Sequence, residues 1–196
     1  MDLEEEMADP TTERNRDQDV SGEKKLEDLY ELIEGIEIAM FTTRRPDGYL
    51  VSRPMATQER AEGADLWFVT NVDSHKLDEL EHDPHVNLAY YRSSNAEWVS
   101  VSGTARISQD RAKIHELYRP DWRAWFGDEG GERDGGPDDP RLALVLVDAH
   151  SVTYLKNNTP RPLVLFHVAK GIVTGQPPKT GDLRELGETE LHPAGR

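Results

Sequence analysis

Three side chains that could bind an anion lie near the end of a predicted strand or the start of a predicted helix. Arg53 is near the end of one strand, and Ser74 and Lys76 open a helix that follows the strand end Phe68–Asn71. The first turn of a helix has N–H groups without intrahelical partners and the positive end of the helix dipole, which together favour a phosphate. If the strand ends lie beside this helix, the guanidinium and the ammonium would complete an anion pocket.

A simpler interpretation of the same residues needs no ligand. Ser74 would cap its helix, and Lys76 would neutralise Asp78 or Glu79 on the next turn. The spacing alone leaves both interpretations open.

Proline and aromatic residues near these segments could form the walls of a ligand site. Pro54 has no N–H to donate to a neighbouring strand, which frees nearby backbone groups, although an ordinary edge strand explains it more simply. Trp98 lies on a predicted strand, whereas Trp122, Trp125 and Phe126 lie in the segment YRPDWRAWFGD. Such side chains can enclose a planar ring. For Trp122 we favour a place in the core or in a dimer contact.

Most motifs of known chemistry are absent from the sequence. It contains no GxxxxGK[ST], GxGxxG, GxSxG or HExxH motif and no cysteine, which excludes disulfides, a thiolate nucleophile and Cys-bound metals. His82 and His85 flank Asp83 and Pro84 at a predicted helix end, where two exposed polar side chains are a simpler interpretation than a metal site.

The charge balance limits the classes of partner. The 196 residues include 23 basic and 38 acidic side chains, giving a formal net charge of -15. Non-specific affinity for nucleic acids and anionic membranes comes mainly from Lys and Arg, so neither partner is expected. No apolar run has the roughly 20 residues of a membrane helix, and the acidic start MDLEEEMADP resembles no secretory signal. We therefore expect a cytoplasmic protein.

Short strands dominate the predicted elements, which favours an antiparallel barrel. The expected strands are Ile36–Thr43, Tyr49–Met55, Leu66–Thr70, Val86–Arg92, Glu97–Ile107, Leu142–Val147 and Leu163–Thr174. The first two strands flank a Pro-Asp-Gly turn and form a hairpin.

Three helices and two polar ends complete the prediction. The spacing of Leu26, Leu29, Tyr30 and Ile33 predicts a helix that ends at Gly35. Shorter helices are predicted over residues 74–80 and 110–118, with Ser74 and Asp110 as N-caps, and residues 127–140 are expected to form a surface loop. The predicted organisation is a disordered acidic tail over residues 1–22, one domain over 23–175 and a polar C-terminal tail over 176–196.

An ordered set of segments resembles one known family. In chain order these segments are TRRPDGYLVSRPM, LWFVTNVDSHKLDEL, DPHVNLAY, VSVSGTARISQDR, AWF and DDPRLALVLV. Together they resemble the pyridoxamine 5'-phosphate oxidase-like, FMN-binding split-barrel superfamily, and within it the general-stress-protein branch. The resemblance implies a mainly β fold, a six-stranded antiparallel split β-barrel, and a homodimer with FMN at the subunit interface.

The resemblance also implies which residues bind FMN. They are Arg53, Pro54, Met55, Val69, Thr70, Ser74, His75, Lys76, Trp98 and Trp125. The strand segment SRPM would lie along the flavin ring, and the helix start would hold the phosphate. Trp98 stands where related oxidases have a glutamine that reaches the flavin across the dimer. His75 stands where arginine is more common, which would make phosphate binding depend on pH.

The C-terminal sequence separates this chain from the vitamin-B6 oxidases of the superfamily. Those enzymes have an Arg-rich C-terminal segment that binds the substrate phosphate, whereas this chain ends in GETELHPAGR. Its expected function is that of an FMN-dependent oxidoreductase or flavin reductase with a nicotinamide or other small electron donor. The alternatives are a flavin-binding carrier or sensor without turnover, a deazaflavin binder on the same barrel, and an acidic β-barrel interaction protein without a ligand.

Overall fold

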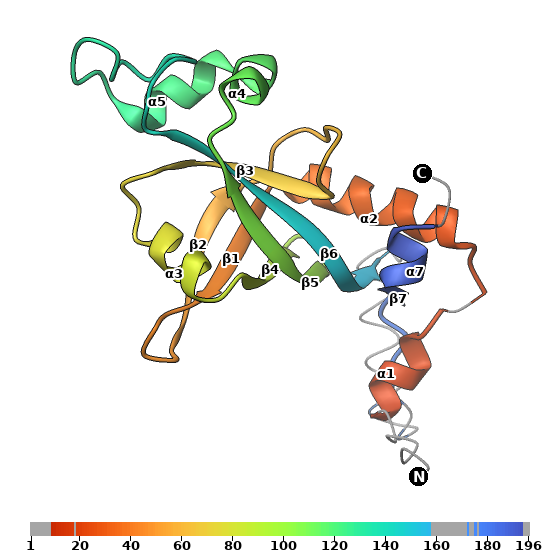
Figure 1. Ribbon diagram of the computed structural model, residues 1–196. Coiled ribbons are helices and arrows are strands. Elements are labelled where there is room, and N and C mark those ends of the chain that lie inside the picture. Colours follow the sequence, from red (N-terminus) through yellow and green to blue (C-terminus); the bar gives the residue numbers. More distant parts are fainter. Residues whose placement is uncertain (1–8, 18, 158–171, 173–174, 176, 194–196) are drawn as a thin grey trace.

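The computed structural model describes residues 9–17, 19–157, 172, 175 and 177–193 (Figure 1). Its strands are β1 (Ile38–Arg44), β2 (Leu50–Ala56), β3 (Leu66–Asn71), β4 (His85–Arg92), β5 (Glu97–Ser108), β6 (Leu142–Lys156) and β7 (Asp182–Gly187). Its helices are α1 (Pro10–Asn15), α2 (Gly22–Ile36), α3 (Lys76–His82), α4 (Arg111–Leu117), the 3-10 turn η1 (Pro120–Trp122), α5 (Arg123–Phe126) and α7 (Glu188–Leu191).

Six strands form one curled antiparallel sheet in the order β2-β1-β4-β5-β6-β3. The sheet curls until its two edges approach each other, and just beyond β2 the N–H of Gln58 donates to the carbonyl of Trp67 in β3 at 3.1 Å. This half-barrel confirms the predicted six-stranded antiparallel sheet. The predicted dimer is a property of two chains and stays a prediction.

A seventh strand extends the sheet where the sequence predicted none. β7 pairs with the second half of the long strand β6, whereas β3 pairs with its first half. The predicted strand Leu163–Thr174 lies almost entirely outside the described residues.

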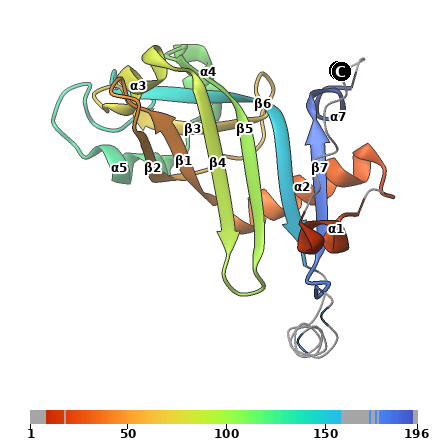
Figure 2. The ribbon, with the colours of Figure 1, turned by 90° about the horizontal axis from the view of Figure 1, so that it is seen from below.

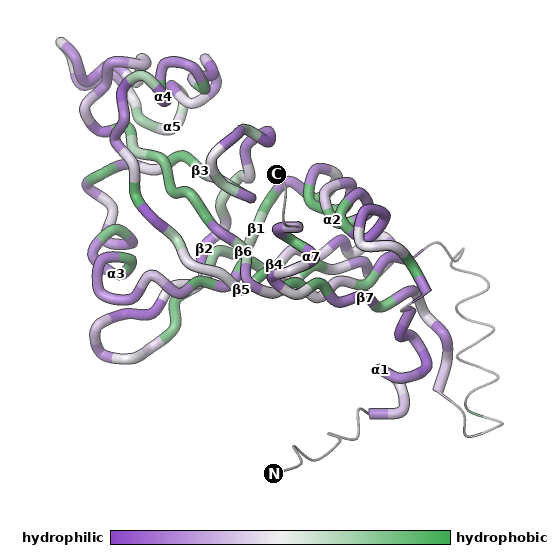
Figure 3. Tube along the Cα trace, turned by 45° about the vertical axis from the view of Figure 1, so that its right-hand side comes forward, coloured by the Kyte–Doolittle hydropathy of each residue, from purple (hydrophilic) through white to green (hydrophobic). Residues whose placement is uncertain are grey.

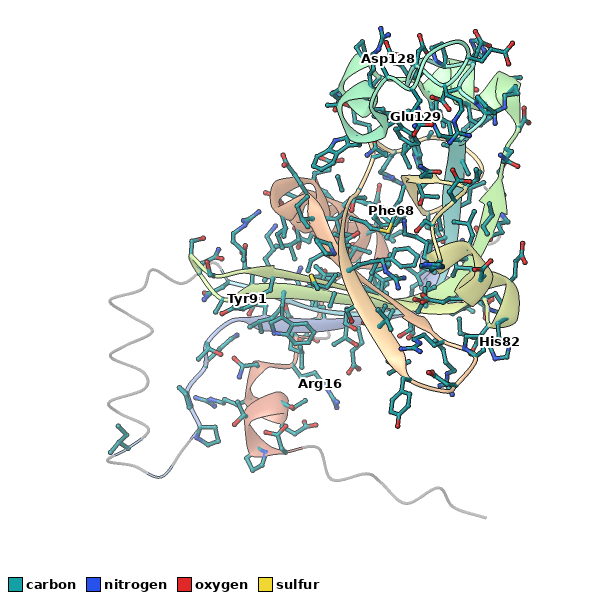
Figure 4. All side chains as sticks on the ribbon, turned by 90° about the vertical axis from the view of Figure 1, so that its left-hand side faces the viewer. Arg16, Phe68, His82, Tyr91, Asp128 and Glu129 are labelled. Atoms are coloured by element: carbon teal, nitrogen blue, oxygen red, sulfur yellow. The ribbon has the colours of Figure 1, made fainter. Side chains whose placement is uncertain are left out.

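The barrel interior is filled by alternate side chains of the strands. Val99 and Val101 of β5 and Phe41 of β1 are buried, and Phe41 meets Phe68 edge to face at 5.2 Å between ring centroids. Figure 4 shows Phe68 in the middle of the barrel. The residues Leu142–Val147 of β6 are buried on both faces, because η1 and α4 pack over the outer side of β6 and β3. Figure 3 shows the matching run of hydrophobic residues along β3.

Helix α2 lies across the barrel and buries the predicted apolar stripe. Leu29, Leu32 and Ile33 are each at most 3% exposed. The helix passes the predicted stop at Gly35 and ends at Ile36, and Glu37 then leaves it with a φ of 67°. No helix in the described part of the chain has the length and apolarity that a bilayer crossing needs.

The two predicted polar tails contain regular structure in their described parts. Helix α1 comes from the predicted N-terminal tail, and β7 and α7 come from the predicted C-terminal tail; Figure 2 shows α1 close to β7. Asn15 is buried and its Oδ1 accepts from the N–H of Thr180 at 2.7 Å, while Asp17 forms an ion pair with Arg184 at 2.9 Å. The composition of both tails suggested disorder, but the described parts of the N-terminal and C-terminal tails bind each other through these hydrogen bonds and ion pairs.

Two local predictions about helix starts had different outcomes. Asp110 caps α4 as predicted, accepting from the N–H groups of Ala112 and Lys113. Ser74 does not cap α3, which begins at Lys76; its backbone instead forms a turn, donating to the carbonyl of Asn71 at 3.1 Å.

Candidate functional site

A pocket of about 390 Å³ lies where the ends of β2 and β3, the start of α3 and the segment η1–α5 meet. It contains six of the predicted site residues: Pro54, Met55, Val69, Thr70, Lys76 and Trp125. β2 and β3 are the two edge strands of the curled sheet, so residues distant in sequence converge at the opening between them. This size is within the usual range of small-ligand sites, about 300–1,000 Å³.

The strand β2 presents backbone and apolar surface to the pocket. Pro54 lies on this edge strand opposite Met40 of β1, as the simpler interpretation of the sequence predicted. The alternation of the strand turns Pro54 outward and Met55 inward, where Met55 is 8% exposed. Both residues line the pocket. At this strand the pocket therefore borders the outer face of the sheet through Pro54 and the barrel interior through Met55.

Lys76 brings a positive charge into the pocket. Its Nζ donates to Oγ1 of Thr70 at 2.5 Å, and within the described residues it forms no ion pair with a carboxylate. Burial, together with the nearby charge of Arg53, outweighs the opposing charge of Glu79 and lowers the pKa of Lys76 below its ordinary value of 10.5. A desolvated ammonium beside a second cation is an arrangement that an anion would stabilise.

Arg53 lies beside the pocket but points toward α3. Its Nη2 donates to Oε2 of Glu79 at 2.8 Å, and its Nη1 donates to Oγ1 of Thr43 at 2.8 Å. The hydroxyl of Thr43 in turn donates to the same Glu79 carboxylate at 2.5 Å. Arg53 therefore lies close to α3, as predicted, but its guanidinium is bound to the carboxylate of Glu79.

Aromatic side chains form the wall opposite β2. Trp122 is 3% exposed, packs against Trp67 and Tyr118, and donates from Nε1 to Oε1 of Gln58 at 3.0 Å. This confirms its prediction as a core residue, and Trp122 lines the pocket as well. Trp125 at the rim is 86% exposed.

Seven pocket residues were not among the predicted FMN-binding residues. They are Ile38, Ala56, Gln58, Asn71, Asp121, Trp122 and Phe126, of which Trp122 and Phe126 were named only as aromatic residues that could enclose a ring. Phe126 belongs to the quoted AWF segment and could have been included. Gln58 follows β2 and Asp121 lies in the 3-10 turn η1, where no periodic pattern marks a side chain as part of a site.

Besides Arg53, three predicted site residues lie outside the pocket of the single chain. His75 is exposed, with its Nδ1 3.9 Å from Oδ2 of Asp78, and Ser74 contributes backbone bonds to the turn before α3. Trp98 lies on the outer face of β5 beside Tyr91 of β4. Figure 4 shows Tyr91 at the end of the sheet far from α3, so Trp98 has no place in this pocket without a second chain.

Other candidate sites do not have comparable chemistry. His85 is paired with Asp83 at 2.7 Å, and the described residues contain no cluster suited to a metal ion. A larger groove of about 1120 Å³ lies along α2 and α7, but Glu23, Glu27 and Glu34 line it and would repel an anion. The pocket at β2 and β3 combines a cation, a hydroxyl and aromatic walls, which suit a planar molecule with an anionic group.

The comparisons with known proteins agree with this architecture. The profile of the family described as "Pyridoxamine 5'-phosphate oxidase like" matches residues 24–179. Protein bli-3 of Neurospora crassa is 40% identical over 190 residues, which are 94% of this chain and 90% of that protein.

Two solved structures show the same fold. A Clostridium acetobutylicum protein related to general stress protein 26 aligns with a TM-score of 0.63 and 17% identity, over 88% of this chain and 100% of that one. The general stress FMN/FAD binding protein of Xanthomonas citri aligns with a TM-score of 0.58 and 26% identity, over 70% of this chain and 92% of that one. The chain is a split-barrel protein of the general stress protein type and belongs to the pyridoxamine 5'-phosphate oxidase-like family.

Proposed function

We propose that the chain binds FMN in the pocket between β2, β3, α3 and α5. Lys76 and the hydroxyl of Thr70 bind the phosphate, and Arg53 lies beside them with its charge paired to Glu79. The observation that carries this proposal is the desolvated ammonium of Lys76, which has a hydroxyl and a second cation beside it. The FMN/FAD binding protein of Xanthomonas citri, with the same fold, supports the choice of ligand.

The remaining pocket residues fit a flavin ring. Pro54 and Met55 offer apolar side chains and the backbone of an edge strand on one side, while Trp122, Trp125 and Phe126 form the other. A bound flavin would supply electron transfer, and the protein would bind it, orient it and keep water from part of its surface. We propose an FMN-dependent oxidoreductase with a nicotinamide or other small electron donor.

Oxidation of a vitamin-B6 phosphate is not part of this proposal. That reaction needs a second anion site, and the described C-terminal residues offer no free cation for one. Arg184 of β7 is bound to Asp17 and Asp28 and is 7% exposed. This favours a small electron donor, and it keeps a carrier or sensor without turnover as the second candidate.

We further propose that two chains form a homodimer through the outer face of β1, β4 and β5. We call this surface the outer sheet face; it comprises Ile38, Met40, Ala89, Tyr91 and Trp98. Met40 is 43% and Tyr91 64% exposed, and apolar side chains gathered on an open sheet commonly mark an interface. Ile38 belongs both to this face and to the pocket, so a second chain on the face would cover the open side of the pocket. In such a dimer Trp98 is available to the partner's flavin.

One experiment distinguishes the candidate functions. The absorption spectrum of the purified protein, with mass spectrometry of the released cofactor, shows whether it carries FMN, a deazaflavin or nothing. Anaerobic bleaching by NADH or NADPH would support the oxidoreductase, and a yellow protein inert to every donor would support the carrier or sensor. A colourless protein that does not bind added FMN would contradict the proposal.

A further inference from the structure

Arg141, immediately before β6, is an almost fully buried arginine that belongs to no predicted site. It is 1% exposed, and its guanidinium donates to the Asp139 carboxylate, with Nη2 2.6 Å from Oδ2. It also donates to the carbonyls of Phe126 at 2.7 Å and Gly127 at 3.0 Å, and to Oε1 of Glu129 at 2.9 Å. Figure 4 shows Glu129 in the loop at the top of the molecule.

These contacts fix the aromatic side of the pocket. Phe126 is the last residue of α5 and Gly127 follows it with a φ of 63°, so both carbonyls lie where a helix leaves its carbonyl groups without partners. The guanidinium of Arg141 satisfies them and so determines where the short helix ends. Trp125 and Phe126, which line the pocket, are on that helix.

The same residue is also connected to the turn between β3 and α3. The carbonyl of Arg141 accepts from the N–H of Val72 at 2.8 Å. Its Nη2 donates to the carbonyl of Arg133, whose own side chain reaches Oδ2 of Asp73 at 3.2 Å. Val72 and Asp73 form the turn that connects β3 to α3, and that turn places Lys76 relative to Thr70.

We propose that Arg141 is a positioning residue that holds the aromatic wall and the turn before α3 at a fixed separation for the flavin. The inference rests on the proposed FMN site. A planar guanidinium with five donors can bind a carboxylate and several carbonyls together, which the three donors of a lysine on one nitrogen cannot do. Arg141→Lys therefore keeps the charge and removes the positioning.

Arg111, the first residue of α4, provides a matched control because its side chain binds the same loop. Its guanidinium donates to the carbonyls of Asp139 at 2.8 Å and Leu142 at 3.2 Å, but it does not contact α5 or the turn before α3. Arg111→Lys should therefore disturb the loop without moving the pocket walls.

The test measures FMN and riboflavin affinity by flavin fluorescence, together with thermal unfolding, for both variants. We expect Arg141→Lys to lower the affinity for both flavins about tenfold, roughly the effect of one lost contact, because the aromatic wall is displaced. In Arg111→Lys the affinity for both flavins should stay within about twofold of the wild-type value, although the melting temperature falls by a similar amount. Equal affinities in the two variants, or equal losses that follow melting temperature, would overturn the inference. If Arg141→Lys does not fold, Asp139→Asn takes its place, with the same expectations.

A second readout separates this inference from the proposed function. Acrylamide quenching of Trp125 fluorescence in the flavin-free protein, with Trp125→Phe as reference, reports the position of the wall directly. We expect altered quenching in Arg141→Lys and unchanged quenching in Arg111→Lys. A wild-type protein that binds no flavin contradicts the proposed function, while unchanged quenching in Arg141→Lys contradicts the positioning role.

Discussion

Arg53 of β2 and Glu79 of α3 form an ion pair with 2.8 Å between Nη2 and Oε2, which links the edge strand to the helix that carries Lys76. Burial alone would raise the pKa of Glu79, but hydrogen bonds from Thr43 and Arg53 hold it below its usual value. Glu79 is therefore charged at neutral pH and keeps the Arg53 guanidinium near the pocket.

Replacing Glu79 should separate stability from flavin binding. Glu79→Gln leaves the Arg53 guanidinium without its carboxylate, and we expect a loss of about 1–3 kcal/mol in the free energy of unfolding. FMN affinity should not fall, because the positive charge of Arg53 is no longer neutralised. Urea unfolding and flavin titration measure the two effects, with the exposed Glu81→Gln on the same helix as control. A loss of affinity that parallels the loss of stability would argue against an anion beside Arg53.

Removing the ammonium of Lys76 from the pocket should weaken the binding of FMN more than that of riboflavin. Lys76→Ala should reduce FMN affinity by about 1.5–3 kcal/mol, the range for a hydrogen bond to a charged group. Riboflavin lacks the phosphate, so its affinity should change little. Lys113→Ala on α4, away from the pocket, is the control. Fluorescence titration with both flavins checks the prediction, and an equal loss for riboflavin would place the phosphate elsewhere.

The pH dependence of FMN binding should report the ionisation of Lys76. Burial lowers its pKa, so the ammonium of the free protein loses its proton at a lower pH than an ordinary lysine. Phosphate attraction needs that proton, so FMN affinity should decline as the pH rises toward the ordinary lysine value. The FMN-to-riboflavin affinity ratio isolates this effect, because ionisation of the ring is common to both ligands. In Lys76→Arg the decline should disappear, since arginine stays charged; a persistent decline would assign it to another group.

The strands and most of the pocket could be predicted because their signals are local. Alternation fixed the faces of β5, and a Pro-Asp-Gly turn fixed the hairpin of β1 and β2. Lys76 and Thr70 were found because strand ends and helix starts are recognisable in sequence, and the fold then joins them. Ser74 was included by the same rule, but α3 begins one residue later than a Ser74 cap would imply, and His75 was included through the family resemblance.

The buried charges could not be found in this way. Arg141 and Asp139 lie in a Gly- and Asp-rich segment whose composition indicates a solvated loop, yet they pair with each other and with groups of the same segment and are buried. Asp28 and Arg184 are 156 residues apart and meet through the pairing of β6 and β7. No pattern within a short window marks a charge whose partner is supplied by another part of the chain.

A charge on the outer sheet face should prevent dimer formation. Met40 lies in the middle of this face, opposite Pro54 and Ala89, so Met40→Glu would place a carboxylate in the proposed interface. Light scattering should show the wild type at twice the 22.2 kDa chain mass and the variant at that mass. Glu62→Lys, in the loop between β2 and β3, is the control. A wild type that is a monomer at micromolar concentration would contradict the proposed dimer.

Substitution of Asp28, outside the pocket, should cause a large loss in the free energy of unfolding. It is 2% exposed and accepts from Lys156 at 2.6 Å, Lys24 at 3.1 Å and Arg184, thereby joining α2 to β6 and β7. Removing one member of a buried charge cluster leaves the others without compensation, so Asp28→Ala should lower the free energy of unfolding by about 3–5 kcal/mol. The exposed Glu27→Ala should change it within experimental error.

The loss of stability at acidic pH provides a second test of the charge cluster around Asp28. Burial alone would raise the pKa of Asp28, but the hydrogen bonds from Lys156, Lys24 and Arg184 outweigh it and hold the pKa below 3.8. A carboxyl with a lowered folded-state pKa stabilises the protein above its unfolded pKa, and that contribution is lost as the pH falls through the folded value. Urea unfolding between pH 7 and about pH 3 should therefore show a shallower acid loss in Asp28→Ala than in the wild type. Parallel curves would show that the pKa of Asp28 is the same in the folded and unfolded protein, which would contradict its stabilising role in this cluster.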